Sequence, residues 1–391
     1  MIDKANNADD FDGYVVKLVR GDIDNAAKKR VAAADMALEA RILSALSHPN
    51  VIRVRGIVGY IERPGNYGII MDKLRSTLQD EILNWSIIVK EEDGIGKAAP
   101  QVKQRSLSTL FPPHSGNDQT HSQRPVLKPN KPKWIMSLQN ETKKQNLIMK
   151  QNELFLERME AAYDIAKAMR YLHTKRIIFR DLKPENVGLA TDKYVLFDFG
   201  LSRELNDTDK VGNKDDDLYH ATGLTGSRLF MAPEVALCKD YGFSADVFSF
   251  AILFWEVMAL RQVFPKLTMN KHFKCVIVKG RRPPSLNDIL PPDLNHMMEL
   301  AWSANPTERP SFESICSTLA TEIEKRNYTD HNASNSSFLP WRTGKFSSND
   351  DEDYDYDDCD QADAANMSLG GNQRRNKNFL ALHLDLKNHF E

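Results

Sequence analysis

The first part of the chain combines two hydrophobic periodicities. Short runs rich in β-branched residues predict three strands, at residues 14–19, 51–62 and 67–74. Between the first two runs, the stretch "AAADMALEARILSAL" carries Met36, Leu43 and Leu46 near helical spacing and predicts one helix. This part of the chain is therefore expected to form a small sheet with one helix.

From residue 148 to residue 326 the pattern is mostly helical. The stretch from 152 to 173 is amphipathic, and the apolar residues on or near its one face are Leu154, Met159, Ile165, Met169 and Leu172. The most apolar long run, "FSFAILFWEVMAL" at 248–260, is too short to span a bilayer and contains Glu256, so we interpret it as a buried core helix. A larger and mainly helical unit is predicted here.

Two segments show neither periodicity. Residues 88–147 are rich in Pro, Ser, Gln, Asn and Lys, and the portion from 97 to 146 holds nine basic residues against two acidic ones. Residues 327–391 are polar, with the acidic block "DDEDYDYDDCD" at their centre. Because neither segment can bury enough apolar surface to fold, we predict a disordered insertion and a disordered acidic tail.

Composition narrows the class of protein. The 391 residues are 41% hydrophobic and 27% charged, with a net charge of −2, which is typical of a globular protein without a basic field for nucleic acid. The beginning, "MIDKANNADDFDGY", lacks the apolar core of a secretory signal. We therefore expect a cytoplasmic protein, with the nucleus as an alternative, and neither a nucleic-acid nor a membrane partner.

The polar residues within "IIFRDLKPENVGLATDKYVLFDFG", residues 177–200, are those that phosphoryl transfer needs. Moving a γ-phosphoryl group requires a protein to aim a hydroxyl and to neutralise charge on the phosphate oxygens. A carboxylate can hold the acceptor hydroxyl, which suits Asp181, and a cation can meet the transferring phosphate, which suits Lys183. Oxygen ligands can hold Mg²⁺, a hard ion, which suits Asn186 and Asp198. The stretch therefore predicts a phosphotransfer site.

The same stretch resembles the catalytic and magnesium loops of eukaryotic protein kinases, and more motifs of that family follow in order. "GSRLFMAPE" resembles the end of the activation segment, and "SADVFSFAILFWEV" resembles the central buried helix. The resemblance implies three structural residues: Asp246 braces the catalytic loop, and Arg309 pairs with Glu234. It covers roughly residues 14 to 326, apart from the insertion.

Further matches upstream imply a nucleotide site. Lys17 in "YVVK" matches the strand lysine that holds the α- and β-phosphates of ATP, and Glu39 matches its helix partner. Met71 stands at the gatekeeper position, and the backbone of Asp72 and Leu74 would meet adenine. The resemblance therefore implies ATP and Mg²⁺ as cofactors.

The type of kinase is indicated by sequence outside the catalytic residues. "LKPEN" resembles serine/threonine kinases, while "KGRRPP" and "AWSANPTERPSF" resemble the tyrosine-kinase-like group. We expect a protein serine/threonine kinase with protein substrates, in which Asp181 and Lys183 are catalytic. The activation segment offers Thr222 and Thr225 to an upstream activating kinase, and Ser227 is expected to face the substrate.

One part of the family pattern is missing. The family places a hairpin with a Gly-x-Gly-x-x-Gly loop before the strand lysine, whereas Gly13 is the single glycine before Lys17. Two explanations are open: the chain is an N-terminally incomplete version of an ordinary kinase, or it is a pseudokinase scaffold that binds ATP poorly. The complete catalytic set favours the first, because a scaffold has no obvious need for it.

The expected fold class is α+β, a bilobal protein kinase fold with a truncated N-terminal β-sheet lobe and a mainly helical C-terminal lobe. The expected limits are a short polar N-terminus at 1–11, a kinase domain at 12–326 and the acidic tail at 327–391. Within the kinase domain we expect a small lobe at 12–74, a large lobe at 75–326 and the insertion at about 88–147.

Overall fold

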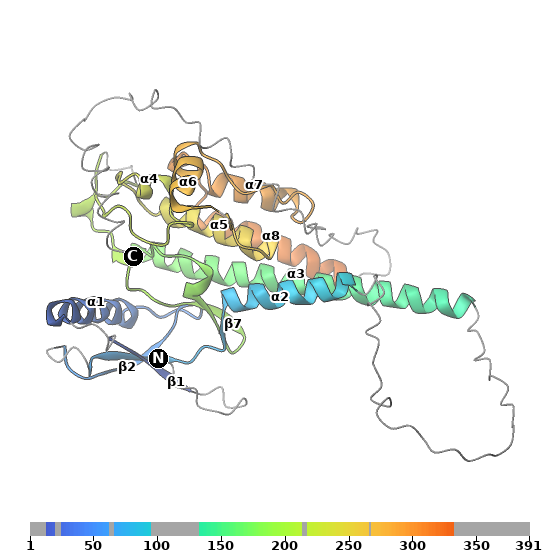
Figure 1. Ribbon diagram of the computed structural model, residues 1–391, viewed down its shortest axis with the longest axis horizontal. Helices are drawn as coiled ribbons and strands as arrows, with labels where there is room; N and C mark the ends of the chain where they lie inside the picture. Colours follow the sequence, from blue (N-terminus) through green and yellow to red (C-terminus); the bar gives the residue numbers. More distant parts are fainter. Residues whose placement is uncertain are drawn as a thin grey trace, which may run out of the picture.

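The molecule has a small sheet-containing end and a long helical body. The computed structural model describes residues 13–19, 25–61, 66–94, 133–212, 217–265 and 267–331. Figure 1 shows α1 and the strands β1 and β2 at one end, with the long helices running away from them. This arrangement agrees with the α+β, two-part architecture predicted from the sequence.

The small sheet has three antiparallel strands in the order β1-β3-β2. Their bounds are Tyr14–Leu18 for β1, Val54–Val58 for β2 and Gly68–Asp72 for β3. Helix α1 spans Ala26–Ser44 and contacts β2 and β3. It begins before the hydrophobic pattern does, because the side chain of Asn25 accepts hydrogen bonds from the N–H groups of Ala27 and Lys28 and so caps the first turn. The prediction of a small sheet with one helix is confirmed.

Strand β1 lies at an edge of this sheet. Within the described residues it pairs with β3 alone, so its other edge carries no strand. Its outward side chains are apolar and exposed, by 63% for Tyr14, 48% for Val16 and 52% for Leu18. An open edge with apolar side chains is a surface on which another strand can add.

Two further small sheets surround the stretch from 177 to 200. The first has the order β4-β6-β7, with bounds Ser76–Thr77, Val187–Ala190 and Lys193–Leu196. The second pairs β5, Ile177–Ile178, with β8, Arg203–Glu204. The amide of Asn50 donates a hydrogen bond to the carbonyl of Tyr194 at 2.8 Å, which ties the turn after α1 to β7. The catalytic stretch is therefore held by strands at both of its ends.

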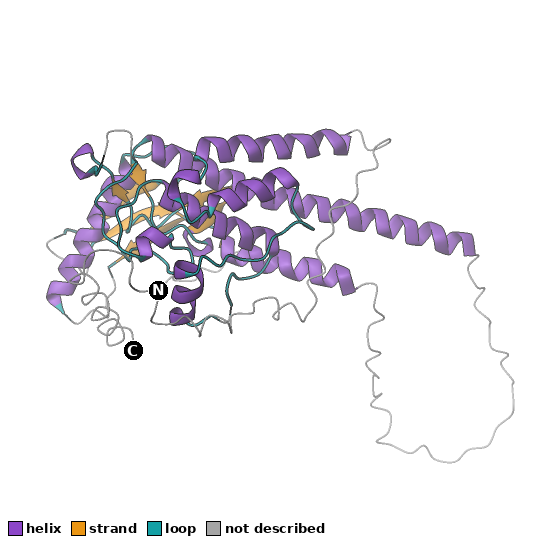
Figure 2. Ribbon diagram, turned by 90° about the horizontal axis from the view of Figure 1, so that it is seen from above, coloured by secondary structure: helices purple, strands orange, loops and turns teal. Residues whose placement is uncertain are grey.

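In the part of the chain that the structure describes, five longer helices build the body of the molecule. Their bounds are Leu78–Gly94 for α2, Lys133–Thr174 for α3, Ser244–Ala259 for α5, Pro292–Ala301 for α7 and Phe312–His331 for α8. The shorter elements are η2 (Pro184–Asn186), η3 (Asp207–Asp209), α4 (Pro233–Ala236), α6 (Met269–His272), η4 (Phe273–Val278) and η5 (Pro306–Glu308). Figures 1 and 2 show the long helices running lengthwise, with the first part of α3 extending beyond the others.

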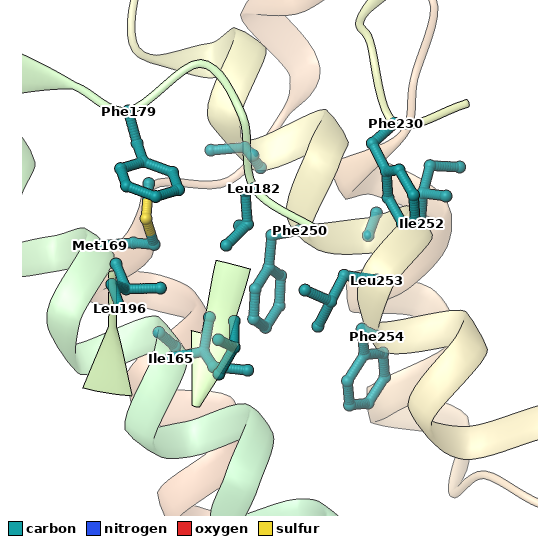
Figure 3. Packing of buried hydrophobic residues seen from close by; sticks show 14 of the residues in the cluster. Ile165, Met169, Phe179, Leu182, Leu196, Phe230, Phe250, Ile252, Leu253 and Phe254 are labelled. Carbon is teal, nitrogen blue, oxygen red and sulfur yellow. The ribbon is translucent and has the colours of Figure 1, made fainter. Parts of the chain in front are cut away.

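Helix α5 forms the centre of the core. It is buried along its length, which confirms the core helix predicted at 248–260. Figure 3 shows side chains of α3, the catalytic stretch and α5 gathered in one cluster, among them Met169, Phe179, Leu182 and Phe250. Among the described residues, no helix is both long enough and apolar enough to cross a bilayer.

The predicted limits of the insertion and of the tail are wrong by several residues. Helix α2 continues to Gly94, and α3 already begins at Lys133. Adding a turn to a helix that is already packed requires little free energy. Helix α2 therefore continues for polar turns after the buried Trp85, and α3 begins with polar turns before the buried Leu154. Helix α8 likewise continues to His331. The expected N-terminus at 1–11, the central part of the insertion at 95–132 and the tail from 332 onward lie outside the described residues.

A buried carboxyl group lies near the end of α5. Glu256 is 4% exposed, and its carboxylate accepts a hydrogen bond of 2.6 Å from the N–H of Val263. Burial raises the pKa of Glu256 to about 8, and the negative charge of Glu185 adds to the rise, while the Val263 N–H opposes it. The folded protein therefore binds this proton more tightly than the unfolded chain does.

We expect Glu256 to make the protein less stable as the pH rises from about 6.5 to about 8. Within this window the unfolded chain has already lost the proton, so each pH unit costs the folded state about 1 kcal/mol. Glu256→Gln keeps an acceptor for Val263 and should flatten this slope in urea denaturation across the window. Glu313→Gln changes an exposed carboxyl group and should keep the wild-type slope. An unchanged slope in the Glu256→Gln protein would contradict the assignment.

Candidate active site

Three charged side chains from distant parts of the chain meet at the small sheet. The ammonium group of Lys17 on β1 contacts Glu39 of α1 at 2.8 and 2.9 Å and Asp198 at 2.9 Å. The side chain of Glu39 is 3% exposed, whereas those of Lys17 and Asp198 are 33% and 45% exposed. The sequence-predicted partners Lys17 and Glu39 are thus brought together, and Asp198 joins them.

The charges of this cluster stabilise one another. Burial by itself lowers the pKa of Lys17, but the carboxylates of Glu39 and Asp198 outweigh it and hold the pKa above its ordinary value. Burial raises the pKa of Glu39, and the Lys17 ammonium group offsets part of that rise. The ammonium group of Lys17 therefore stays charged and is held in place by the two carboxylates.

The backbone at Asp198 is held in an uncommon conformation. Its φ of 61° lies in the left-handed region, which costs energy for a residue with a side chain. The next residue, Phe199, donates its N–H to Glu39 at 3.1 Å, and its ring meets that of Phe179 edge-on at a centroid distance of 5.0 Å. These contacts fix the Asp198 carboxylate relative to α1 and the catalytic stretch.

A second cluster surrounds Asp181. One carboxylate oxygen accepts the N–H of Ser227 at 2.8 Å, and the other accepts the side-chain N–H of Asn186 at 2.7 Å. The ammonium group of Lys183 lies 3.1 Å from the Asp181 carboxylate and donates to the Ser227 hydroxyl at 2.8 Å. The structure therefore brings the predicted residues Asp181, Lys183 and Asn186 together with Ser227.

Asp246 on α5 supports the backbone of this cluster. Its buried carboxylate accepts the N–H of Phe179 at 2.9 Å and the N–H of Arg180 at 2.8 Å. It also contacts the Nε2 atom of His173 at 3.0 Å. Since Arg180 has a φ of 69°, these hydrogen bonds hold a strained turn immediately before Asp181.

A buried ion pair holds the end of the segment that carries Ser227. Both terminal nitrogens of Arg309 contact Glu234, at 2.6 and 2.9 Å, and the guanidinium group also donates to the carbonyls of Ser303 and Ser244, each at 2.9 Å. The Arg309 side chain is fully buried. The predicted pair of Glu234 and Arg309 is thus present and has good bidentate geometry.

The segment after β3 leaves backbone groups available. Met71 is buried, and the Asp72 carboxylate is paired with Arg55. Within the described residues, the N–H and C=O groups of Leu74 make no backbone hydrogen bond. A Cβ on Gly188 would come within 2.3 Å of the Leu74 side chain, so that side chain lies closely over Gly188. A backbone donor and acceptor beside apolar side chains suit the edge of a purine ring.

Two oxygen atoms suit a hard cation. The amide nitrogen of Asn186 is used by Asp181, and one oxygen of Asp198 is used by Lys17, so one oxygen on each of Asn186 and Asp198 accepts no hydrogen bond from the described residues. No set of three or more His, Cys, Asp or Glu side chains arranged for a metal occurs in the described ranges. These residues therefore fit an ion such as Mg²⁺ if a bound ligand supplies further oxygens.

The activation segment is tied to the catalytic stretch through Arg180. Its guanidinium group donates to the Thr222 hydroxyl at 2.9 Å and to the carbonyl of Leu201 at 2.6 Å. The Thr225 hydroxyl donates to the carbonyl of Thr222 at 3.0 Å. Gly226 has a φ of 105°, and a Cβ there would lie 2.1 Å from the carbonyl oxygen of Arg180, so the close approach requires glycine.

Two contacts of the site were not predicted from the sequence. His173 reaches Asp246, and the Ser227 hydroxyl reaches Lys183. His173 lies in the last turn of α3, and Ser227 lies in the loop before α4. Their partners lie 73 and 44 residues away in the chain, so no local pattern could have indicated these contacts.

Comparison with known proteins identifies the family. The family model of protein tyrosine and serine/threonine kinases matches residues 14–319. The serine/threonine-protein kinase VIK of Arabidopsis thaliana is 38% identical over 175 residues, which is 44% of this chain and 38% of VIK. The dual specificity protein kinase shkC of Dictyostelium discoideum is 35% identical over 166 residues, 41% of this chain and 31% of shkC.

A further relative is the serine/threonine-protein kinase STY17 of Arabidopsis thaliana, 34% identical over 162 residues, which is 41% of this chain and 26% of STY17. The chain thus matches well under half the length of these relatives. The family match, by contrast, extends over most of this chain and includes both side-chain clusters described above. The chain belongs to the protein tyrosine and serine/threonine kinase family.

Proposed function

We propose that this chain transfers the γ-phosphoryl group of ATP to serine or threonine hydroxyls of proteins. The observation that carries the proposal is the contact of Lys17 with both Glu39 and Asp198, formed while Asp181 accepts two N–H groups. One cluster offers a fixed cation for phosphate oxygens, and the other offers a fixed carboxylate for a hydroxyl. Positioning and charge neutralisation are what phosphoryl transfer requires of a protein.

In this proposal the first cluster and the segment after β3 bind the nucleotide. Lys17 would hold the α- and β-phosphates, with Glu39 as its positioning residue, and the backbone of Asp72 and Leu74 would meet adenine behind the gatekeeper Met71. Asn186 and Asp198 would hold Mg²⁺, which neutralises phosphate charge when it is bound. One oxygen on each of Asn186 and Asp198 accepts no hydrogen bond within the described part of the chain, which supports this assignment.

The second cluster acts on the acceptor. Asp181 orients the hydroxyl and takes its proton, and Lys183 stabilises the charge on the transferred group. Asn186 and the Ser227 N–H fix the Asp181 carboxylate, so that little reorganisation is needed during the reaction. The relatives VIK and STY17 are named as serine/threonine kinases, which supports Ser and Thr as acceptors.

A second candidate function is that of a pseudokinase scaffold. The edge of β1 favours it, because among the described residues β1 pairs with β3 alone and carries the exposed side chains of Tyr14, Val16 and Leu18, to which a partner's strand can add. The two functions differ in nucleotide binding: the enzyme requires saturable, Mg²⁺-dependent binding of ATP, whereas a scaffold of this kind does not.

The test is transfer of labelled phosphate from ATP to a mixed protein substrate by the full chain, followed by identification of the phosphorylated residues. Label on Ser or Thr that depends on Mg²⁺ supports the proposal. The Asp181→Asn protein is the negative control, and its expected behaviour is given in the Discussion. No transfer by the full chain would overturn the enzyme, and a lack of saturable ATP binding in the same preparation would favour the scaffold.

Phosphorylation at Thr222 is expected to activate the protein. Arg180 already donates to the Thr222 hydroxyl at 2.9 Å, so a phosphate there would gain charge-assisted hydrogen bonds and order the segment. Thr225 was the other predicted position, but its hydroxyl is engaged by the Thr222 carbonyl. Phosphatase treatment or Thr222→Ala should lower activity by about tenfold.

The matched control is Thr208→Ala, which alters an exposed threonine in η3 of the same segment. Mass spectrometry of an active preparation should find phosphate on Thr222. Full activity with Thr222 unmodified would count against this mode of regulation.

A further inference from the structure

Arg228, which follows Ser227 in the chain, has no side-chain partner among the described residues. Arg228 directly follows Ser227, whose N–H contacts Asp181 and whose hydroxyl contacts Lys183. Arg228 is half-buried, and within the described residues its guanidinium group has no hydrogen-bond, ion-pair or ring partner. A guanidinium group carries five N–H donors and is not deprotonated in proteins, so one that lacks a partner is available to an anion.

The backbone that carries Arg228 is fixed. Gly226 approaches the carbonyl of Arg180 so closely that no other residue fits there. The N–H of Phe230 donates to the carbonyl of Ser227 at 3.0 Å, and the hydroxyl of Ser249 on α5 donates to the carbonyl of Phe230 at 2.8 Å. Arg228 is therefore presented from a rigid turn rather than from a loose loop.

The surroundings of Arg228 are positively charged. The carboxylate of Glu234, six residues further along the chain, is used by Arg309, and the guanidinium group of Arg282 donates to backbone carbonyls. Burial, together with Arg228 and Arg282, lowers the pKa of the buried His272 on α6 to about 4. His272 is thus neutral at physiological pH, and no acidic side chain of the described residues pairs with Arg228.

A second group of basic residues follows Arg228 later in the chain. The segment from 257 to 287, which contains α6 and η4, holds seven Lys or Arg residues and no Asp or Glu. Lys274, Lys279 and Arg281 are exposed on it. Element α4, which follows the Arg228 turn, contacts η4. A peptide that places its acceptor hydroxyl at Asp181 and runs past Arg228 would therefore enter a positive field.

We propose that Arg228 is a specificity-determining residue that selects acceptor sites flanked by carboxylate or phosphate groups. The inference rests on the proposed function, because it names the class of protein substrate for the same site. The guanidinium group would bind the anionic flank through paired N–H groups, and the basic surface of α6 and η4 would extend the preference to longer acidic runs.

The chain itself contains a sequence of this kind. Ser347 and Ser348 are followed by Asn349 and then by Asp350, Asp351, Glu352 and Asp353. These residues lie outside the described ranges, and by sequence they belong to the class of acceptor sites that are followed by carboxylates. A peptide of residues 344–354 is therefore the natural probe of the preference.

The test measures binding of this peptide by fluorescence anisotropy, and of a neutral version in which the four acidic residues from 350 to 353 become Asn or Gln. The protein is the full-length chain with the same four residues neutralised, so that its own tail does not compete. We expect it to bind the acidic peptide about tenfold more tightly than the neutral one. In the Arg228→Gln protein the two affinities should become equal to within about twofold.

Lys28→Gln, which removes an exposed cation from α1, is the matched control and should keep the tenfold preference. Arg228→Glu should prefer a peptide with four Lys residues at the same positions, which separates a charge effect from a loss of folding. An acid preference that survives Arg228→Gln, or a wild-type protein without preference, overturns the inference. Because binding is measured without phosphoryl transfer, a missing transfer activity would sink the proposed function and leave this result readable.

Discussion

Replacing Asp181 by Asn is expected to lower the rate of phosphoryl transfer by about 10³-fold while nucleotide affinity stays within about twofold. The Asp181 carboxylate is fixed by the Ser227 N–H and the Asn186 amide at 2.8 and 2.7 Å, and it lies 3.1 Å from Lys183. An amide has nearly the same shape but cannot take the proton of the acceptor hydroxyl. Residue 181 belongs to the acceptor side of the site, so the contacts of Lys17 with Glu39 and Asp198 should remain in the variant.

Initial rates of phosphate transfer and equilibrium binding of ATP with Mg²⁺ check this expectation on one preparation. Asp192→Asn changes an exposed carboxylate in the turn between β6 and β7 and should leave both quantities unchanged. Undiminished transfer by the Asp181→Asn protein would remove Asp181 from its assigned role. Lost nucleotide binding would instead show that the substitution disturbs the whole site.

Replacing Arg309 by Ala is expected to lower the free energy of unfolding by about 3–5 kcal/mol. The guanidinium group contacts Glu234 at 2.6 and 2.9 Å, and the two side chains are 0% and 6% exposed. Without Arg309 the Glu234 carboxylate stays buried with no compensating cation. That uncompensated charge, rather than the net value of the pair, produces the large effect.

Urea denaturation measures the change, and an exposed pair supplies the control. Arg170 and Glu313 lie 3.3 Å apart with side chains 40% and 76% exposed, so Arg170→Ala should cost at most about 1 kcal/mol. Equal losses for the two variants would mean that the Arg309 pair is no more important than a surface contact. The Arg309→Ala protein should also lose activity, because the segment that carries Ser227 ends at this pair.

The sequence predicted the elements that have a clear hydrophobic period and the residues that stand in recognisable motifs. The buried run at 248–260 is a buried helix, and the strands around Lys17 and Met71 pair as expected. The start of α3 at Lys133 was missed, because its first turns are polar and resemble a solvated segment. A hydrophobic period arises because one face of a helix is buried. The part of a helix that extends beyond its packed region has no buried face and therefore shows no such period.

The site divides in the same way. Asp181, Lys183, Asn186 and Asp198 stand close together in the chain, so their chemistry could be inferred before any geometry was known. The supporting role of Asp246 followed from the family resemblance, whereas the contacts of Ser227 with Asp181 and of His173 with Asp246 could not be inferred, since these partners lie tens of residues apart in the chain. Arg228 was overlooked for a related reason: what distinguishes it is the absence of a partner among the described residues, which only coordinates reveal.

The support that α5 gives to the catalytic stretch has a consequence for biosynthesis. The N–H group of Arg180 bonds to Asp246, which comes 66 residues later in the chain. During translation, Asp181, Lys183 and Asn186 are therefore synthesised well before α5, the helix whose Asp246 holds their turn. A nascent chain that ends before Asp246 contains the reactive side chains without their arrangement, so synthesis itself delays the site until the core helix has formed and the unit can fold as a whole.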